Sequence, residues 1–188
     1  MTTIIGISGS LRKGSYNAAL LRAAAELAPS DCKIEIVSIK GIPLYDGDLE
    51  TAQGIPAVVT DIKNRVAAAE GLLLVTPEYN NSIPGVFKNA IDWLSRPPAD
   101  IAHVFGNKSG GLIGATPGRM GTAFSQTAWL PVLRTLGTRP FFGKTLYVSG
   151  AAKVFDAAGR LTDNELRERL RAYVEQFAAF AAAARESR

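Results

Sequence analysis

The stretch that decides the fold is Gly9–Asn17, with the sequence GSLRKGSYN, which follows the apolar run Thr3–Ser8 and leads into a helical pattern from Ala18. A strand, a turn rich in glycine and hydroxyl groups, and then a helix typically form a phosphate-binding site. The first backbone N–H groups of a helix lack intrahelical partners and carry the positive end of its dipole, so a bound anion satisfies both. The alternative is a βα turn that is merely solvated.

The spacing within this turn excludes two common phosphate sites. Gly9 and Gly14 are spaced as in a nucleotide-triphosphatase loop, but Ser15 and Tyr16 stand where that loop needs a lysine and a magnesium-binding hydroxyl. The glycines also fail the G-x-G-x-x-G pattern of dinucleotide sites. The remaining donors form a small cup that suits a terminal phosphate monoester. Its side chains are Ser10, Arg12, Ser15 and Asn17.

Composition predicts one domain over residues 1–188, with 47% hydrophobic and 20% charged residues. No apolar run approaches the ~20 residues that span a bilayer, so membrane insertion is not expected. Cys32 is the only cysteine, which excludes an internal disulfide and fits the cytoplasm. The formal charge of +4 comes without dense Lys and Arg runs, which favours small anionic ligands over nucleic acid.

The apolar pattern alternates between strands and helices, as in a parallel sheet covered on both faces. Strands are predicted at 3–8, 33–39, 72–75, 108–115 and 144–148. Helices are predicted from 18, at 57–69, 86–94 and 122–136, where Pro131 should introduce a kink, and after a capping box at 162–165. Residues 40–56 are expected to be a long loop, and the alanine-rich end near 178–184 is expected to fray.

Five such strands most commonly adopt the order 2-1-3-4-5, in which strands 1 and 3 are neighbours at the switch point. Ligands of open α/β sheets bind there, outside the carboxyl ends of the strands. The turns Gly9–Asn17, Thr76–Gly85 and Thr116–Gly121 follow strands 1, 3 and 4. One ligand can therefore touch all three, with its phosphate in the first turn, a flat body along the second and a polar edge against the third.

Two of these turns carry a family resemblance. Gly9–Asn17, together with Pro77–Gly85 (PEYNNSIPG) and the helix Lys88–Ser95 (KNAIDWLS), resembles the NADPH-dependent FMN reductase family, and within it the bacterial quinone and chromate reductases. The resemblance extends from Ile4 to the C-terminal helix. It implies a flavodoxin-like three-layer sandwich that binds FMN noncovalently. NADPH or NADH would reduce the flavin, and quinones or similar acceptors such as chromate, azo dyes or free flavin would reoxidise it.

The resemblance also implies site residues. Those assigned to the phosphate are Ser10, Arg12, Ser15 and Asn17, with Tyr16 beside them. Those assigned to the isoalloxazine are Pro77, Glu78, Tyr79 and Asn80, and those at its pyrimidine edge are Thr116 and Gly118. The chemistry belongs to the flavin, so neither a catalytic side chain nor a metal is expected. Beyond Gly118 the resemblance weakens, and in Arg119–Leu136 both Trp129 and Pro131 are unexpected.

Several roles stay open at this stage. Glu78 offers either its backbone N–H, which is favoured, or a carboxylic acid, while Tyr79 either stacks beside the flavin or packs. His103 is expected in a surface loop, and Cys32 is given no redox role. Trp93 falls off the apolar stripe of its helix, which predicts a second buried surface and hence a homodimer or homotetramer.

Three further expectations concern the ligand and the mechanism. The cup leaves no obvious exit for a second phosphate, so FMN is expected to bind more tightly than riboflavin or FAD. Donor and acceptor are expected to use one flavin face in turn, which is a ping-pong mechanism. Two alternatives remain: a flavodoxin-like one-electron carrier or other non-catalytic flavin-binding protein, and a phosphate-binding regulator without flavin. The basic charge argues against the carrier, which is expected to dock through an acidic surface.

Overall fold

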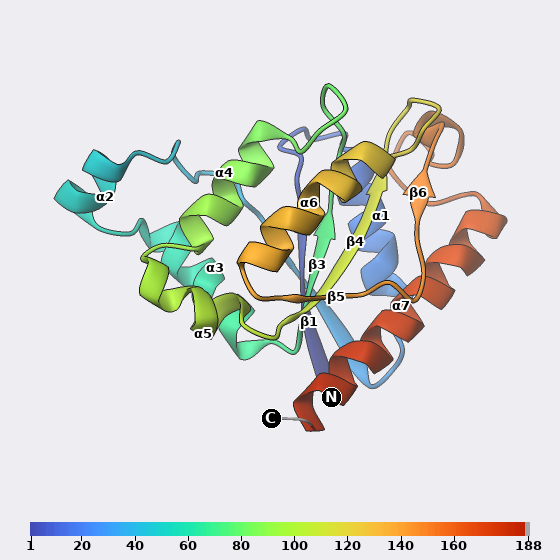
Figure 1. The fold of residues 1–188 in the computed structure, drawn as a ribbon. Helices are drawn as coiled ribbons and strands as arrows, with labels where there is room; N and C mark the ends of the chain where they lie inside the picture. Colours follow the sequence, from blue (N-terminus) through green and yellow to red (C-terminus); the bar gives the residue numbers. More distant parts are fainter. Residues whose placement is uncertain (187–188) are drawn as a thin grey trace.

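A computed structural model describes residues 1–186, with side chains through 184. Its parallel sheet has the order β2-β1-β3-β4-β5, which confirms the predicted topology (Figure 1). The strands are β1 Thr2–Ser8, β2 Cys32–Val37, β3 Gly71–Val75, β4 Ser109–Ala115 and the short β5 Arg139–Pro140. β1 pairs with both β2 and β3, so the reversal of strand order lies between β1 and β3.

Helices cover both faces of the sheet (Figure 1). One face carries α1 Tyr16–Glu26 and α7 Asn164–Glu186; the other carries α3 Ala57–Ala68, α4 Gly85–Leu94, α5 Ile101–Phe105 and α6 Ala123–Thr135. Short 3₁₀ turns lie at Pro98–Asp100 and Ala151–Lys153. His103 therefore lies in α5 and not in the predicted loop.

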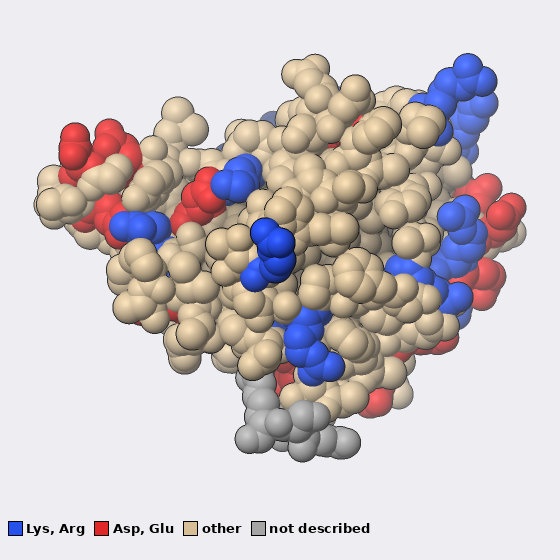
Figure 2. Space-filling view, in the orientation of Figure 1, with Lys and Arg blue, Asp and Glu red and all other residues tan. Residues whose placement is uncertain are grey.

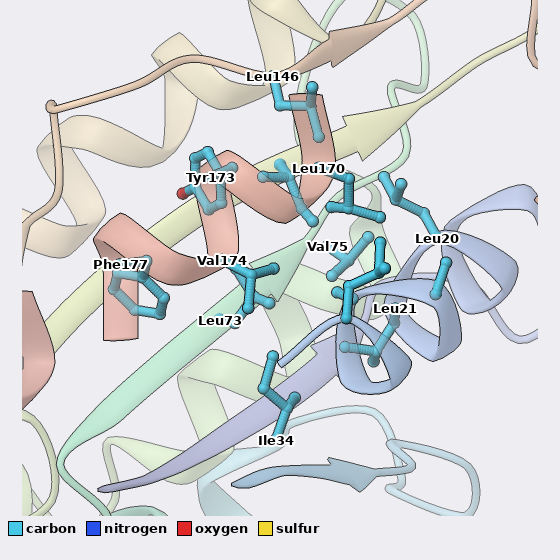
Figure 3. Packing of buried hydrophobic residues seen from close by; sticks show 14 of the residues in the cluster. Leu20, Leu21, Ile34, Leu73, Val75, Leu146, Leu170, Tyr173, Val174 and Phe177 are labelled. Atoms are coloured by element: carbon cyan, nitrogen blue, oxygen red, sulfur yellow. The ribbon is translucent and has the colours of Figure 1, made fainter. Parts of the chain in front are cut away.

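The two faces form separate hydrophobic clusters because alternate strand residues point to opposite sides. On β1, Ile4 joins the cluster under α1 and α7, whereas Ile5 joins the cluster under α3 to α6. Figure 3 shows the first cluster, where Leu73 and Val75 of β3 meet side chains of both covering helices. All five residues of β3 are buried, as expected for a central parallel strand.

The fifth strand was predicted over 144–148, and this is wrong in its extent. Instead β4 pairs with β5 at Ser109 and Gly110, and with β6, Tyr147–Val148, at Gly114 and Ala115. Between them the Tyr173 hydroxyl of α7 accepts from the Leu112 N–H at 2.9 Å and donates to the Leu112 carbonyl at 3.1 Å. This hydroxyl supplies both hydrogen bonds that a strand residue would make. Its burial raises the pKa of Tyr173 above the ordinary tyrosine value.

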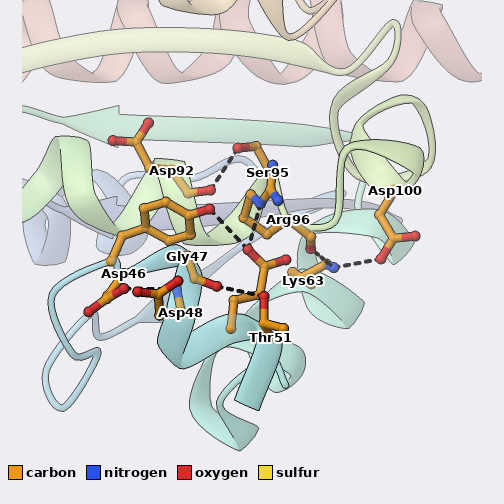
Figure 4. A network of polar contacts seen from close by, with 11 residues as sticks. Asp46, Gly47, Asp48, Thr51, Lys63, Asp92, Ser95, Arg96 and Asp100 are labelled. Carbon is orange, nitrogen blue, oxygen red and sulfur yellow. Dashed lines mark hydrogen bonds and ion pairs between the residues drawn. The ribbon is translucent and has the colours of Figure 1, made fainter. Parts of the chain in front are cut away.

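Residues 40–56 contain the helix α2, Gly47–Gln53, where a loop was predicted. None of its residues is fully buried, so it has no apolar stripe to reveal it in the sequence. Polar contacts hold it instead (Figure 4): Glu50 accepts from the Arg96 Nε at 2.8 Å and from the Tyr45 hydroxyl at 3.0 Å. The Arg96 hydrogen bond is the main reason why the pKa of Glu50 is lowered.

Two local expectations also need correction, and Cys32 can now be placed. The N-cap of α7 is Asp163, whose carboxylate accepts from the Leu166 N–H at 2.7 Å, and not Thr162. Residues 178–184 do not fray but are helical, with Ala181 fully buried. Cys32 is the first residue of β2, and its burial raises its pKa to about 11, which keeps the free thiol protonated at neutral pH.

Surface charge is distributed unevenly. Figure 2 shows acidic side chains gathered over α2, while the Lys and Arg residues on the same face of the molecule are scattered.

No helix in the described part of the chain combines the length and apolar character needed to cross a membrane. Among the residues described, no His, Cys, Asp and Glu side chains cluster in a way that could hold a metal ion.

Candidate functional site

Three turns converge on one pocket at the carboxyl ends of β1, β3 and β4, as the topology predicted. The pocket measures about 410 Å³ and opens to solvent. Its walls are Ser10, Arg12, Ser15, Tyr16, Asn17, Pro77, Glu78, Tyr79, Ala115, Thr116 and Pro117. Nine of these eleven residues were predicted from the sequence. Asn80 and Gly118 were predicted but lie outside the walls.

The first turn keeps several donors available for an anion. Ser15 is the N-cap of α1, and its Oγ accepts from the Ala18 N–H at 3.2 Å, which leaves the hydroxyl proton to donate elsewhere. Ser10 is placed in the same way, because its Oγ accepts from the Arg12 N–H at 3.4 Å. The Arg12 guanidinium is exposed and donates to the Gly14 carbonyl at 3.3 Å, so most of its N–H groups remain free.

Gly9 fixes the start of this turn against the neighbouring strand and helix. Its N–H donates to the Val75 carbonyl of β3 at 3.0 Å. A Cβ at this position would lie 2.1 Å from the Phe87 ring of α4, closer than any side chain tolerates. The close packing of α4 on the turn therefore requires glycine here.

Asn17 has a role that the sequence did not reveal. Its side-chain amide donates to the Ala115 carbonyl at 2.8 Å, and its oxygen accepts from the Ala115 N–H at 2.9 Å. The side chain is buried, and it joins the start of α1 to the end of β4. Asn17 was predicted as a phosphate ligand only, yet most of its hydrogen bonding goes to the backbone, and one amide hydrogen remains for a ligand.

The second turn is a tight two-residue hairpin. Tyr79 and Ser82 exchange both backbone hydrogen bonds, at 3.1 and 3.0 Å, around Asn80 and Asn81. Both asparagines have positive φ, 49° and 60°, as the central residues of a type I′ turn do. Asn80 thus shapes the turn from outside the pocket. Tyr79 is 45% exposed, so its ring is not a packed core residue.

Helix α6 supports the second turn from behind through a buried polar network. The Thr76 hydroxyl contacts the Ser125 hydroxyl at 2.8 Å and accepts from the Trp129 Nε1 at 3.1 Å. The Glu78 carboxylate accepts from the Ser125 N–H at 3.0 Å, in the first turn of α6. This contact favours a positioning role for the Glu78 carboxylate over that of a general acid. The divergent stretch that contains α6 therefore belongs to the architecture of the site.

The third turn is held by the segment that follows β6. The Thr116 N–H donates to the Val148 carbonyl at 2.9 Å, and the Gly118 carbonyl accepts from the Gly150 N–H at 3.2 Å. Ala115 and Pro117, which sequence reasoning missed, complete the wall on either side of Thr116. They carry no polar side chain, and only their position next to Thr116 at the end of a predicted strand could have revealed them.

The place of Trp93 off the apolar stripe of its helix predicted a second buried surface. This prediction is wrong. The side chain is fully buried within the chain, and its Nε1 donates to the Pro43 carbonyl at 2.9 Å. The Tyr45 ring meets it edge-on, with centroids 5.0 Å apart. The segment before α2 folds over this side of α4 and covers the indole.

Comparison with known proteins identifies the family. Residues 2–153 match the model of the NADPH-dependent FMN reductase family. The protein belongs to the NADPH-dependent FMN reductase family. It is 46% identical over 165 residues to an NAD(P)H-dependent FMN reductase of Pseudomonas aeruginosa, covering 88% of this chain and 87% of the relative. It is 39% identical over 174 residues to a 2-hydroxy-1,4-benzoquinone reductase of Burkholderia sp., covering 93% of each.

Among solved structures, the reductase chain is similar to FerB, a flavoenzyme NAD(P)H:(acceptor) oxidoreductase from Paracoccus denitrificans. The TM-score is 0.87 at 31% identity, over 98% of this chain and 99% of that one. The predicted flavodoxin-like fold, the family and the enzyme class are therefore confirmed. This protein is an oxidoreductase that uses FMN and NAD(P)H, which excludes a carrier and a flavin-free regulator.

The residues of the first turn fit the phosphate of FMN. Two hydroxyl protons, from Ser10 and Ser15, and the free N–H groups of Arg12 face an end of α1 whose first N–H groups also need acceptors. A phosphate monoester carries several acceptor oxygens and close to two negative charges, so it matches this set. Tyr16 and Asn17 line the same part of the pocket.

The Asn17 bridge generates a prediction about stability. Asn17→Ala leaves the Ala115 N–H and carbonyl without partners, which should lower the free energy of unfolding by about 2 kcal/mol. Urea denaturation of the flavin-free protein measures this loss. Asn64→Ala, at an exposed position of α3, is the matched control and should change stability by less than about 0.5 kcal/mol. Equal stability of the two variants would contradict the assigned role of the bridge.

Proposed function

We propose that this reductase passes electrons from NADPH or NADH through FMN to quinones or similar small acceptors, which include chromate, azo dyes and free flavin. The observation that supports this most is that the donors of the first turn, Ser10, Arg12 and Ser15, line the same open pocket as the second and third turns. Relatives named as quinone reductases, among them one of Pseudomonas putida at 37% identity over 93% of this chain, support the acceptor class.

The chain's residues bind and orient the cofactor in this proposal. When bound, FMN would supply the redox chemistry between NAD(P)H and the acceptor. Ser10, Arg12 and Ser15 hold the phosphate, while Pro77 to Tyr79 line the isoalloxazine. Thr116 would offer its hydroxyl at the pyrimidine edge, because that oxygen accepts from the Gly118 N–H at 3.3 Å and keeps its proton to donate. Its backbone N–H and carbonyl are already bonded to Val148 and Ala151. The buried Thr76, Ser125 and Trp129 network fixes the backbone of the second turn, and no nucleophile is needed.

The phosphate cup predicts a strong preference for FMN over riboflavin. Charge-assisted hydrogen bonds contribute about 1.5–3 kcal/mol each, so losing two should weaken binding by at least ~100-fold. Arg12→Ala should cost about 1–2 kcal/mol, because the guanidinium is exposed and screened. Fluorescence titration of the flavin-free protein measures both effects, with Arg134→Ala on α6 as the charge-matched control. Riboflavin binding within a few-fold of FMN would refute the assignment of this turn.

Steady-state kinetics test whether donor and acceptor bind in turn at the same open side of the pocket, which is a ping-pong mechanism. The three turns line the pocket and leave it open to solvent. In this proposal donor and acceptor use the same open side, so the oxidised NAD(P)+ must leave before the acceptor enters. Double-reciprocal plots of rate against NADPH concentration at several quinone concentrations should be parallel. The same pattern is expected with NADH. Intersecting lines would indicate a ternary complex and contradict the shared side.

The proposed assembly is a homodimer or homotetramer that uses the face of α4. A groove of about 700 Å³ lies between α4, α5 and α6, with Ile91, Ile101 and Val132 in its walls. Light scattering at micromolar concentration should give at least the mass of a dimer, and Ile101→Glu should lower the measured mass. Ile36→Glu, at an exposed position of edge strand β2, is the control and should leave the measured mass unchanged. A monomeric wild-type protein would remove this proposal.

The proposed compartment is the cytoplasm, where the protein would act without nucleic-acid partners or membrane insertion. The buried free thiol of Cys32 is compatible with a reducing environment. Cell fractionation with an activity assay tests the compartment, and recovery of the activity in a periplasmic fraction would contradict it.

A further inference from the structure

A second hollow adjoins the phosphate cup. It measures about 550 Å³ and lies between the start of α1 and the loop 156–159. Ser15 and Tyr16 line both this hollow and the pocket of the three turns, so the two spaces are neighbours on either side of these residues. The sequence predicted no exit from the cup for a second phosphate, but Lys13 and Gly14 of the same turn line this neighbouring hollow.

The hollow has an excess of positive charge. Lys13 and Arg22 contribute two cations, and neither has an ion-pair partner among the described side chains. The one carboxylate of the wall, Asp156, already pairs with the Arg160 Nε at 2.7 Å. It also accepts from the backbone N–H groups of Ala158 and Arg160, at 2.9 and 2.8 Å. Arg160 thus balances the charge of the Asp156 carboxylate, while Lys13 and Arg22 remain available to bind an anion.

The position of the Arg22 guanidinium is set by the loop beside it. Gly159 has a φ of 75°, and a Cβ there would lie 2.9 Å from an Arg22 Nη atom. The positive φ favours glycine here, and the absence of a Cβ leaves room for the guanidinium beside the loop backbone. Tyr16 of α1 stacks with Phe155 at a centroid distance of 6.0 Å, which holds the start of the loop against the same helix. Both walls of the hollow are therefore tied to α1.

We propose that this hollow binds a second phosphoryl group joined to the one in the cup, so that the reductase accepts a flavin 5′-pyrophosphate, FAD, as well as FMN. The inference rests on the proposed assignment of Ser10, Arg12 and Ser15 as the flavin phosphate site. In this proposal a pyrophosphate passes from the cup to the hollow beside Ser15 and Tyr16, which line both, and its second phosphoryl group meets the unpaired cations Lys13 and Arg22. A guanidinium is well suited to two oxygens of one phosphate.

Titration of the flavin-free protein with FMN and FAD tests the proposal. FAD should bind within about ten-fold of FMN. Removing one exposed cation by Arg22→Gln should weaken FAD about five-fold, while FMN changes by less than two-fold. Arg22→Lys keeps the charge but not the planar pair of donors, so it should restore only part of the FAD affinity. Arg134→Gln removes one positive charge on the opposite face of the sheet and should leave both Kd values unchanged. Thermal melting of each variant verifies folding, and Arg22 is exposed, so the fold should tolerate these changes.

The outcomes separate this inference from the proposed function. If FMN itself fails to bind, the flavin phosphate site is wrong and the inference falls with it. If FMN binds but FAD is more than ~100-fold weaker, a loss of over 2.7 kcal/mol, only the inference is overturned. It is also overturned if Arg22→Gln weakens FMN and FAD equally or neither of them. A selective rise in the KM for NADPH, with FAD binding unchanged, would assign the hollow to the donor's 2′-phosphate instead.

Discussion

The arrangement of the site depends on the two hydrogen bonds between the Asn17 side chain and the Ala115 backbone. The site combines turns from three strands, and the sheet alone fixes only where those strands end. Asn17 ties the first turn of α1 to the backbone of Ala115 with two hydrogen bonds, 98 residues apart in sequence. Because the side chain is buried, water does not compete with these bonds. The phosphate turn and the third turn therefore keep a fixed separation before any ligand arrives.

The second turn is fixed by a different device. A buried hydroxyl pair and an indole N–H connect Thr76 to Ser125 and Trp129 of α6, and the Glu78 carboxylate accepts from the first turn of the same helix. Every one of these groups has a partner, so the network adds rigidity without leaving a buried polar atom unsatisfied. The stretch 119–136, where the resemblance in the sequence is weakest, thus supports the second turn from behind.

Much of this could be read from the sequence, and the reasons for the failures are physical. The place of the turn 9–17 and the strand order follow from local patterns, because strands, polar turns and helices alternate along the chain. The helix α2 could not be found that way, since Glu50 holds it by ion pairing with Arg96 and not by an apolar stripe. Trp93 was misplaced because its partner, the Pro43 carbonyl, comes from a segment with no regular pattern. The split fifth strand depends on one hydroxyl from α7, which no periodicity encodes.

That hydroxyl links the order of synthesis to the completion of the sheet. The first four strands end at Ala115, and β6 ends at Val148, yet the middle of β4 has no partner on its outer side until Tyr173 is present. A nascent chain on the ribosome therefore exposes the Leu112 N–H and carbonyl at an open strand edge while the following residues are still being made. Unpaired edges of this kind recruit other strands. The last helix thus completes the sheet, and a chain without Tyr173 keeps an unpaired N–H and carbonyl at the middle of β4.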